Sequence, residues 1–176
     1  MNAVAKHYNG LPDRHRTMKS GSAVLGLRNF NNSVKTACIS EYVKAGDTVL
    51  DLGCGRGGDL AKFHHAKIAK WVGVDVASNS VHDAESRFRG SSRRHDFAFE
   101  AEFHVADFTR SGDIPRGTFD VISCQMAMHY AFGSESSARS FFAAVADRLK
   151  PGGFLLTTVP DPEVIVRRVR AGACQN

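Results

Sequence analysis

Short apolar runs alternate with helix-like stretches along most of the chain. Five runs predict buried strands, at residues 47–55, 71–76, 100–107, 119–124 and 154–159. Four other stretches have helical spacing or helix-starting residues, at 31–46, 58–68, 78–88 and 134–149. Strands that alternate with helices are typical of a parallel sheet covered by helices on both faces, so we expect an α/β fold.

The predicted helix ends follow from particular residues. Ser78 is expected to cap the helix over 78–88, and Ser134 to open the helix over 134–149. The letters KPGG at 150–153 are expected to end that last helix before the final strand. The same helix places five apolar residues on one face: Ala138, Phe141, Phe142, Val145 and Leu149.

The beginning of the chain has a different composition. Residues 1–20 are polar and contain Gly and Pro, so we expect little regular structure there. We therefore divide the chain into a basic N-terminal arm, residues 1–30, and one domain, residues 31–176. With 176 residues, of which 43% are hydrophobic, the chain is long enough to bury one sizeable core.

Composition excludes several classes of protein. The N-terminus has no signal or transit pattern, and no apolar run approaches the roughly 20 residues of a membrane helix. We expect a soluble intracellular protein that makes no contact with a membrane. The cysteines are scattered and unpaired in sequence, which predicts neither a metal site nor a disulfide framework. They are Cys38, Cys54, Cys124 and Cys174.

Positive charge gathers in two places. The formal net charge is +5, with basic residues crowded into the first 35 residues and into the letters RGSSRRHD at 89–96. Such clusters are compatible with a solvated basic face and with contact to a polyanion, and the sequence leaves both open.

The letters LDLGCGRGGD at 50–59 are the strongest local signal. Glycines at a turn from strand to helix let the backbone approach a ligand, and the following helix offers free amide donors. The pattern also fits G-x-G-x-x-G, which a nicotinamide-dinucleotide fold would show as well. A tight turn that requires glycine for its own sake is the third alternative.

Carboxylates stand at the ends of three predicted strands. Asp75 could accept hydrogen bonds from both hydroxyls of a ribose, or could simply cap a helix. Asp107 could contact an adenine amine, or could be an ordinary loop residue. With Asp51 beside the glycine turn, the set suits a cationic cofactor without phosphate better than an anionic dinucleotide.

Taken together, the motifs resemble those of a known family. The letters VLDLGCGRGGDL, GVDVA, ADF, FDVISCQ and LKPGGF resemble the class I S-adenosylmethionine-dependent methyltransferases. More narrowly, HYN, LRNFNNSVK and CQMAMHYAF look like the messenger RNA cap guanine-N7 methyltransferases. The resemblance runs from about residue 5 to residue 168. It implies a Rossmann-like fold, and the family continues with further strands after the last one predicted here.

The resemblance also implies the ligands and the residues that hold them. The cofactor would be S-adenosylmethionine, with contacts from Lys35, Gly53, Asp75, Asp107 and Gln125. The partner would be 5′-capped RNA, with cap contacts from Asn31, Asn32, Arg56, Lys62, Arg87 and His129. Arginine and lysine suit the triphosphate bridge, while asparagine and histidine can hydrogen-bond guanine or ribose. Tyr130 could pack on the base or fill the core.

The implied reaction needs no catalytic base. Guanine nitrogen-7 carries a free lone pair, so attack on the sulfonium methyl requires alignment rather than removal of a proton. We therefore expect binding residues and no general base. A nuclear location is implied for a cellular protein and a cytoplasmic one for a viral protein.

The resemblance covers only part of the family's domain. In the family, a C-terminal segment completes the sheet and the cap pocket, and the resemblance does not extend to it, so we expect a truncated sheet with the final strand at its edge. Other capping enzymes, or the C-terminal segment supplied by a second chain, are possible partners. The alternatives are a non-catalytic fragment that binds cap or cofactor, and a methyltransferase of another acceptor.

Overall fold

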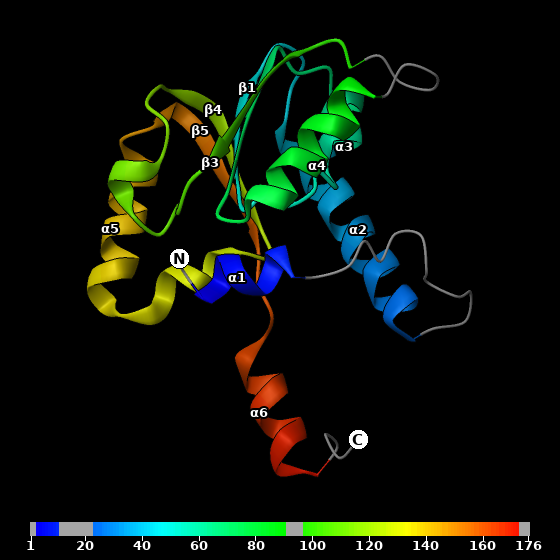
Figure 1. Cartoon of the computed structure of the whole chain (residues 1–176), viewed down its shortest axis with the longest axis vertical. Helices are drawn as coiled ribbons and strands as arrows, with labels where there is room; N and C mark the ends of the chain where they lie inside the picture. Colours follow the sequence, from blue (N-terminus) through cyan, green and yellow to red (C-terminus); the bar gives the residue numbers. More distant parts are fainter. Residues whose placement is uncertain (1–2, 11–22, 91–96, 173–176) are drawn as a thin grey trace.

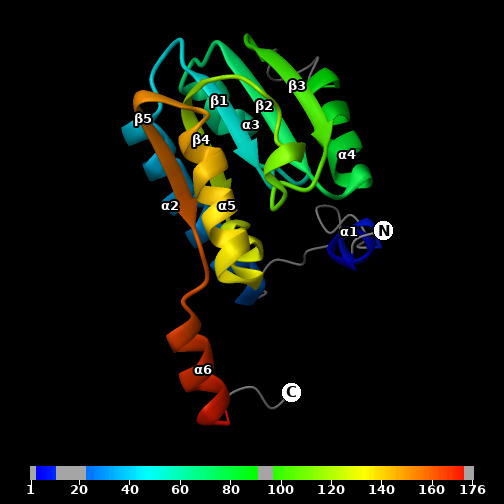
Figure 2. The same ribbon diagram turned by 90° about the vertical axis from the view of Figure 1, so that its left-hand side faces the viewer.

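The computed structural model describes residues 3–10, 23–90 and 97–172 of the chain. Five parallel strands form one sheet in the order β3-β2-β1-β4-β5 (Figure 2). The strands are β1 (Thr48–Leu52), β2 (Lys70–Asp75), β3 (Glu100–Val105), β4 (Phe119–Gln125) and β5 (Leu149–Thr158). The expected Rossmann-like α/β fold is therefore confirmed.

Helices cover both faces of this sheet (Figure 1). The α-helices are α1 (Ala3–Asn9), α2 (Ala23–Tyr42), α3 (Leu60–His65), α4 (Ser78–Arg89), α5 (Glu135–Ala146) and α6 (Pro162–Arg170). The 3-10 helices η2 (Ser111–Asp113) and η3 (Met128–Gly133) lie in the loops that flank β4.

Alternate residues of the central strands enter different core layers. Val49, Trp71 and Val121 pack with residues of α2 and α3 on one face. Leu50 and Ile122 pack with residues of α5 on the other face. Strands β1, β2 and β4 are buried on both faces and read as nearly continuous apolar runs, which is why the sequence predicts them correctly. The edge strands β3 and β5 are only partly buried.

The N-terminal elements differ from the expectation. Residues 3–9 form helix α1 where little regular structure was expected, and Ala5 of this helix is buried. Helix α2 begins at Ala23 rather than at residue 31. The apolar residues of its first turns, Leu27 and Phe30, are exposed. Because these residues do not face the core, they do not repeat with the spacing of a buried helix face, and the sequence does not predict these turns. Residues 11–20 lie outside the described part of the chain, and the division at residue 30 stays a prediction.

The N-cap of α4 and the start of β5 also differ from the expectation. The N-cap of α4 is Ala77 rather than Ser78, and the side chain of Asp75 accepts the N–H of Ala77 at 2.9 Å in its place. The letters KPGG do not precede β5 but lie within it, at a shift of register between Phe119 and Val121 of the neighbouring strand. A bulge accommodates Pro and Gly without ending the strand.

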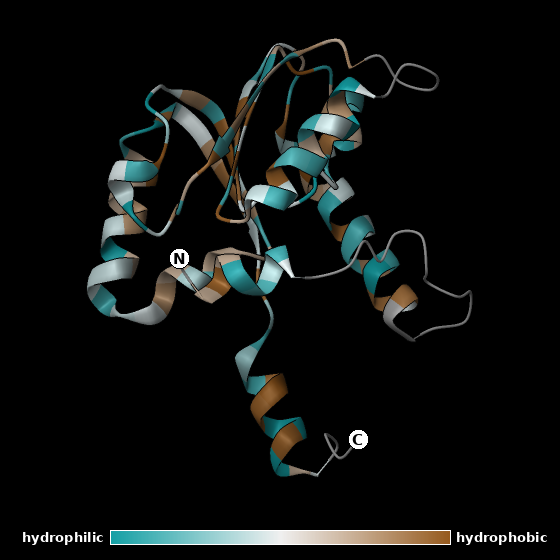
Figure 3. Cartoon of the chain, viewed as in Figure 1, coloured by the Kyte–Doolittle hydropathy of each residue, from teal (hydrophilic) through white to brown (hydrophobic). Residues whose placement is uncertain are grey.

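Strand β5 lies at one edge of the described sheet, as expected. Helix α2 covers part of it, since the rings of Tyr42 and Phe154 lie 5.1 Å apart. Helix α6 follows β5 and extends away from the sheet (Figures 1 and 2). Its hydrophobic residues are visible in Figure 3, and three of them are about half exposed: Ile165, Val166 and Val169. None of the helices described is long and apolar enough to cross a bilayer.

Helix α5 begins as predicted, but its buried face is narrower. The hydroxyl of Ser134 accepts the N–H of Ser137 at 3.1 Å and caps the helix. Phe141 is fully buried, whereas its neighbour Phe142 is 42% exposed, so the expectation that both lie in the core is wrong for Phe142. Adjacent helix positions differ by about 100° in direction, and only one of the two can face the sheet.

This difference between neighbours gives a stability test. Phe141→Ala should lower the free energy of unfolding by about 3–5 kcal/mol, because it leaves a cavity in the core. Phe142→Ala is the matched control and should cost less than about 1 kcal/mol. Urea unfolding followed by circular dichroism measures both, and equal losses in the two variants would contradict the assigned orientation of α5.

Candidate functional site

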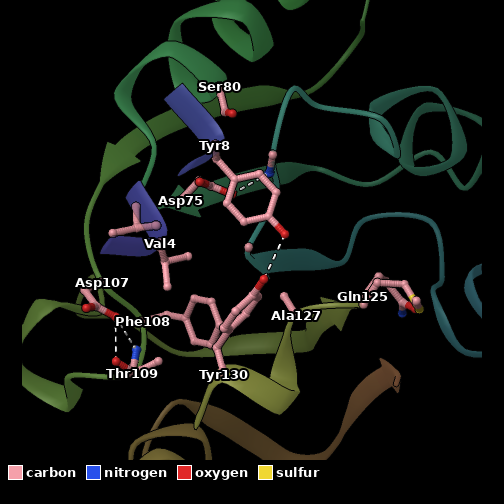
Figure 4. Close-up of a pocket in the computed structure, with 14 residues that line it drawn as sticks. Val4, Tyr8, Asp75, Ser80, Asp107, Phe108, Thr109, Gln125, Ala127 and Tyr130 are labelled. Atoms are coloured by element: carbon pink, nitrogen blue, oxygen red, sulfur yellow. Dashed lines mark hydrogen bonds between the residues drawn. The ribbon is translucent and has the colours of Figure 1, made fainter. Parts of the chain in front are cut away.

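A pocket lies at the carboxyl ends of β1, β2 and β4, where open parallel sheets bind ligands. It encloses about 770 Å³, including space open to solvent. Its lining is shown in Figure 4 and comes from five parts of the chain. The lining residues are Val4, Tyr8, Gly53, Gly55, Asp75, Val76, Ser80, Asp107, Phe108, Thr109, Gln125, Met126, Ala127 and Tyr130.

The glycine turn after β1 forms the floor of this pocket. The N–H groups of Gly53 and Cys54 both donate to the carbonyl of Val74, at 2.8 and 3.1 Å. Gly53 has φ +74°, and a Cβ added there would lie 2.5 Å from the Cβ of Ala127. Gly55 has φ +53° and faces open space, so its backbone is accessible to a ligand.

The next side of the pocket is formed by Asp75 at the end of β2. Its carboxylate accepts the N–H of Gly55 at 2.8 Å and that of Ala77 at 2.9 Å, which fixes both of its oxygens. Burial raises the pKa of Asp75, against the opposing effect of these two donors. The carboxylate thus both fixes the glycine turn and keeps lone pairs for hydroxyl donors.

Asp107 and Gln125 complete the polar lining. Asp107 accepts the N–H and the hydroxyl of Thr109, at 3.1 and 2.6 Å (Figure 4). Gln125 is buried, donates to the carbonyl of Leu156 at 3.3 Å and accepts the hydroxyl of Thr158 at 2.9 Å. Its amide is therefore held by β5 at the rim of the pocket.

Four of the five predicted cofactor residues line this one pocket: Gly53, Asp75, Asp107 and Gln125. Lys35 is not among the lining residues. Its ammonium group lies 2.9 Å from a carboxylate oxygen of Asp59, just behind the glycine turn. The lining residues include two carboxylates and no lysine or arginine.

The predicted cap residues lie outside the pocket, and most of them gather around the far side of the glycine turn. Lys62 contacts Asp59 at 2.6 Å and the amide oxygen of Asn32 at 3.4 Å. Arg87 donates to the carbonyl of Gly57 at 3.3 Å, which ties α4 to the same turn. Arg56 lies within the turn and pairs with Asp83 of α4 at 3.3 Å.

The other two predicted cap residues lie apart from this group. Asn31 precedes Asn32 on α2 and is partly buried. His129 lies in η3, is exposed, and its ring lies 4.4 Å from that of Tyr130. His129 is therefore a neighbour of Tyr130, which lines the pocket. Asn31 instead lies beside Asn32, whose amide oxygen contacts Lys62 of α3.

The lining also contains Tyr130, for which the sequence left two roles open, and residues that the sequence did not predict. Tyr130 is 38% exposed and lines the pocket, so of the two roles left open for it, filling the core is wrong. Val4 and Tyr8 come from α1, for which the sequence predicted little structure. The letters HYN at 7–9 contribute to the family resemblance, but nothing in their spacing indicates a pocket.

Asp51 lies beneath the glycine turn and is 3% exposed. Burial raises the pKa of its carboxyl group to about 7, and the negative charge of Asp59 adds to this effect. The positive charge of Lys35 opposes it. The floor of the site therefore contains a carboxyl group that titrates close to neutral pH.

Comparisons with known proteins place this chain in context. The sequence profile of the mRNA (guanine-N(7))-methyltransferase domain matches residues 1–176. The chain is 38% identical over 177 residues to mRNA cap guanine-N(7) methyltransferase 1 of Oryza sativa, covering 95% of this chain and 47% of that protein. It is 38% identical to mRNA cap guanine-N(7) methyltransferase of Drosophila melanogaster, covering 96% and 44%. The chain thus spans about half the length of these relatives.

Solved structures share the fold at lower identity. A complex of DhpI with SAH has a TM-score of 0.65 at 16% identity, covering 91% of this chain and 69% of that chain. Magnesium protoporphyrin IX methyltransferase of Synechocystis with bound SAM has a TM-score of 0.60 at 17% identity, covering 85% and 75%. These similarities show the fold.

The buried Asp51 predicts how stability depends on pH. Its pKa is raised in the folded state, so the folded chain binds more protons than the unfolded chain between about pH 4 and pH 7. The contribution of Asp51 to the free energy of unfolding is therefore fully present below that range, falls as pH rises and is lost above pH 7. Asparagine does not titrate, so the free energy of unfolding of Asp51→Asn, relative to that of the unchanged chain, should rise by about 2–3 kcal/mol from pH 5 to pH 8.

Chemical unfolding at both pH values measures this gain. Asp113→Asn, at an exposed carboxylate of η2, is the matched control. A difference between Asp51→Asn and the unchanged chain that does not vary with pH would contradict the raised pKa.

Proposed function

The chain belongs to the mRNA (guanine-N(7))-methyltransferase family, and from this membership we propose that it transfers a methyl group from S-adenosylmethionine to nitrogen-7 of the guanosine cap of RNA. The observation that carries the proposal is the charge of the site. An acidic pocket lies on one side of the glycine turn, and a basic group formed by Arg56, Lys62 and Arg87 lies on the other. Since the relatives are proteins of eukaryotes, we infer a nuclear location.

The pocket residues fit the proposed cofactor. S-adenosylmethionine supplies a methyl group bonded to a positively charged sulfur, and it carries no phosphate. Asp75 and Asp107 provide negative charge, and the lining has no cation that would favour a pyrophosphate. This charge pattern argues against the nicotinamide dinucleotide that the glycine motif alone would allow.

Within the pocket, each polar group has a proposed contact. Asp75 would accept the ribose hydroxyls, since the two N–H donors that fix it leave lone pairs free. Asp107 would accept the adenine amine, and Gly53 and Gly55 would present their backbone to the amino-acid half. Lys35 would reach the carboxylate of that half from behind the turn, where it now pairs with Asp59.

The basic group would bind the triphosphate bridge of the cap. Arg56, Lys62 and Arg87 surround the outer side of the turn, and each is partly buried. Asn31 and Asn32 of α2 would contribute amide hydrogen bonds beside them. Two carboxylates, Asp59 and Asp83, neutralise part of this charge. A polyanion would therefore compete with these ion pairs for the arginine and lysine side chains.

The reaction would depend on alignment. Guanine nitrogen-7 offers a lone pair without losing a proton, so no residue of the chain has to act as a general base. The residues of the site hold the two reactants in line, and effective molarities of roughly 10⁵ M or more indicate how much orientation contributes. His129 and Tyr130 lie beside the mouth of the pocket, where the acceptor base would approach.

The proposal is tested by transfer of labelled methyl from S-adenosylmethionine to RNA that ends in an unmethylated guanosine cap. We expect transfer to this RNA only, and none to uncapped RNA or to RNA with a methylated cap. Binding of S-adenosylhomocysteine without transfer would favour a binding module. Transfer to small acceptors but not to capped RNA would favour a methyltransferase of another class.

His129 provides a separate test of the division between the two ligands. His129→Ala should reduce transfer to capped RNA about tenfold, because it removes a hydrogen-bonding group on the acceptor side. Binding of S-adenosylhomocysteine should change by less than about threefold. His82→Ala, at an exposed histidine of α4, is the matched control. Equal losses of transfer and of binding would contradict this assignment.

A further inference from the structure

Helix α1 forms one wall of the pocket although it lies far from the other walls in sequence. Val4 and Tyr8, one helical turn apart, both line the pocket. Figure 4 shows the ring of Tyr8 beside Asp75, and Val4 on the side of Asp107 and Phe108. Two carboxylates that the proposed function assigns to the nucleoside half thus lie next to side chains of α1.

The phenols of Tyr8 and Tyr130 meet across the pocket. Their hydroxyl oxygens lie 2.9 Å apart and share a hydrogen bond, and their rings lie edge to face with centroids 6.5 Å apart. Each of the two tyrosines is more than one third exposed, so neither belongs to the core. The two hydroxyls therefore face a space that a ligand can enter, and both can exchange this bond for a ligand contact.

Helix α1 is held in place by contacts outside the pocket. The side chain of Asn9 accepts the N–H of Asn79, at 3.0 Å. The backbone carbonyl of Asn9 accepts the side-chain amide of Asn79, at 3.2 Å. Ala5 is buried on the same helix. These contacts attach α1 to α4 without using Tyr8, so the ring keeps its position when its hydroxyl exchanges the bond to Tyr130 for a ligand contact.

Chemistry of the phenol fits a donor to the ligand. Burial raises the pKa of Tyr8 to about 12, and the hydrogen bond to Tyr130 and the negative charge of Asp75 act in the same direction. Tyr8 therefore remains protonated throughout the physiological range. A protonated phenol beside an acidic wall can donate to a ribose oxygen and can pack its ring against a base.

We propose that Tyr8 is a further ligand-binding residue of this pocket and that it contacts the nucleoside half of the cofactor. This inference rests on the proposed function, because it takes the pocket as the cofactor site. Helix α1 is then part of the site, and the bond between Tyr8 and Tyr130 gives way to ligand contacts when the cofactor binds.

The test is calorimetric binding of two ligands to the full 176-residue chain. S-adenosylhomocysteine contains both halves of the cofactor, and 5′-methylthioadenosine lacks the amino-acid half. Tyr8→Ala should weaken both ligands by the same factor, about tenfold or more. Tyr8→Phe keeps the ring and should weaken both about threefold, because it removes only one hydrogen bond.

Tyr42→Phe is the matched control, since Tyr42 is the other tyrosine outside the proposed pair and packs on Phe154. It should change neither affinity by more than about twofold. Circular dichroism of each variant checks that the fold is kept, and Tyr8→Phe remains informative if Tyr8→Ala fails to fold.

Three outcomes would overturn the inference. Unchanged affinity of folded Tyr8→Ala would show that Tyr8 does not contact the ligand, while leaving the proposed function intact. A loss for S-adenosylhomocysteine without a loss for 5′-methylthioadenosine would place Tyr8 at the amino-acid half instead. No binding of either ligand to the unchanged chain would overturn the cofactor proposal and this inference together.

Discussion

The close approach of the turn after β1 to the segment after β4 is the constraint on which the site depends. Gly53 has no room for a Cβ, which would lie 2.5 Å from the Cβ of Ala127. The same turn is tied to β2 by two N–H groups that donate to the carbonyl of Val74. These contacts join the ends of three neighbouring strands, β1, β2 and β4, and Gly53, Asp75 and Gln125 line the pocket at these ends. Helix α1 and the segment after β3 form its other walls.

Electrostatics divide the surroundings of this turn into two regions. Asp75 and Asp107 line the pocket, whereas Lys62 and Arg87 contact the outer side of the turn. The carboxylate of Asp59 pairs with both Lys35 and Lys62, which reduces the repulsion between the two ammonium groups. Two ligands of opposite charge could therefore bind on either side of one backbone segment.

Much of the fold and part of the site followed from local sequence. The three central strands were predicted because strands buried on both faces are apolar throughout. The edge strands β3 and β5 are only partly buried and carry a weaker pattern. Asp75 and Asp107 were predicted as pocket residues because carboxyl ends of parallel strands share one edge. Phe142 was misplaced because a helix of 12 residues with several apolar side chains does not specify which of two neighbours faces the sheet.

The sequence by itself determined the succession of the five strands and of helices α2 to α5 along the chain, the glycine turn and the carboxylates around it, because each of these depends on neighbours within a few residues. Only the tertiary structure decided that α1 forms a wall of the pocket and that Tyr8 meets Tyr130, 122 residues away. It also decided that Lys62 reaches Asn32 of another helix. The physical reason is that a helix as short as α1 has no periodic pattern strong enough to predict it, and its position is set by packing and hydrogen bonds to α4.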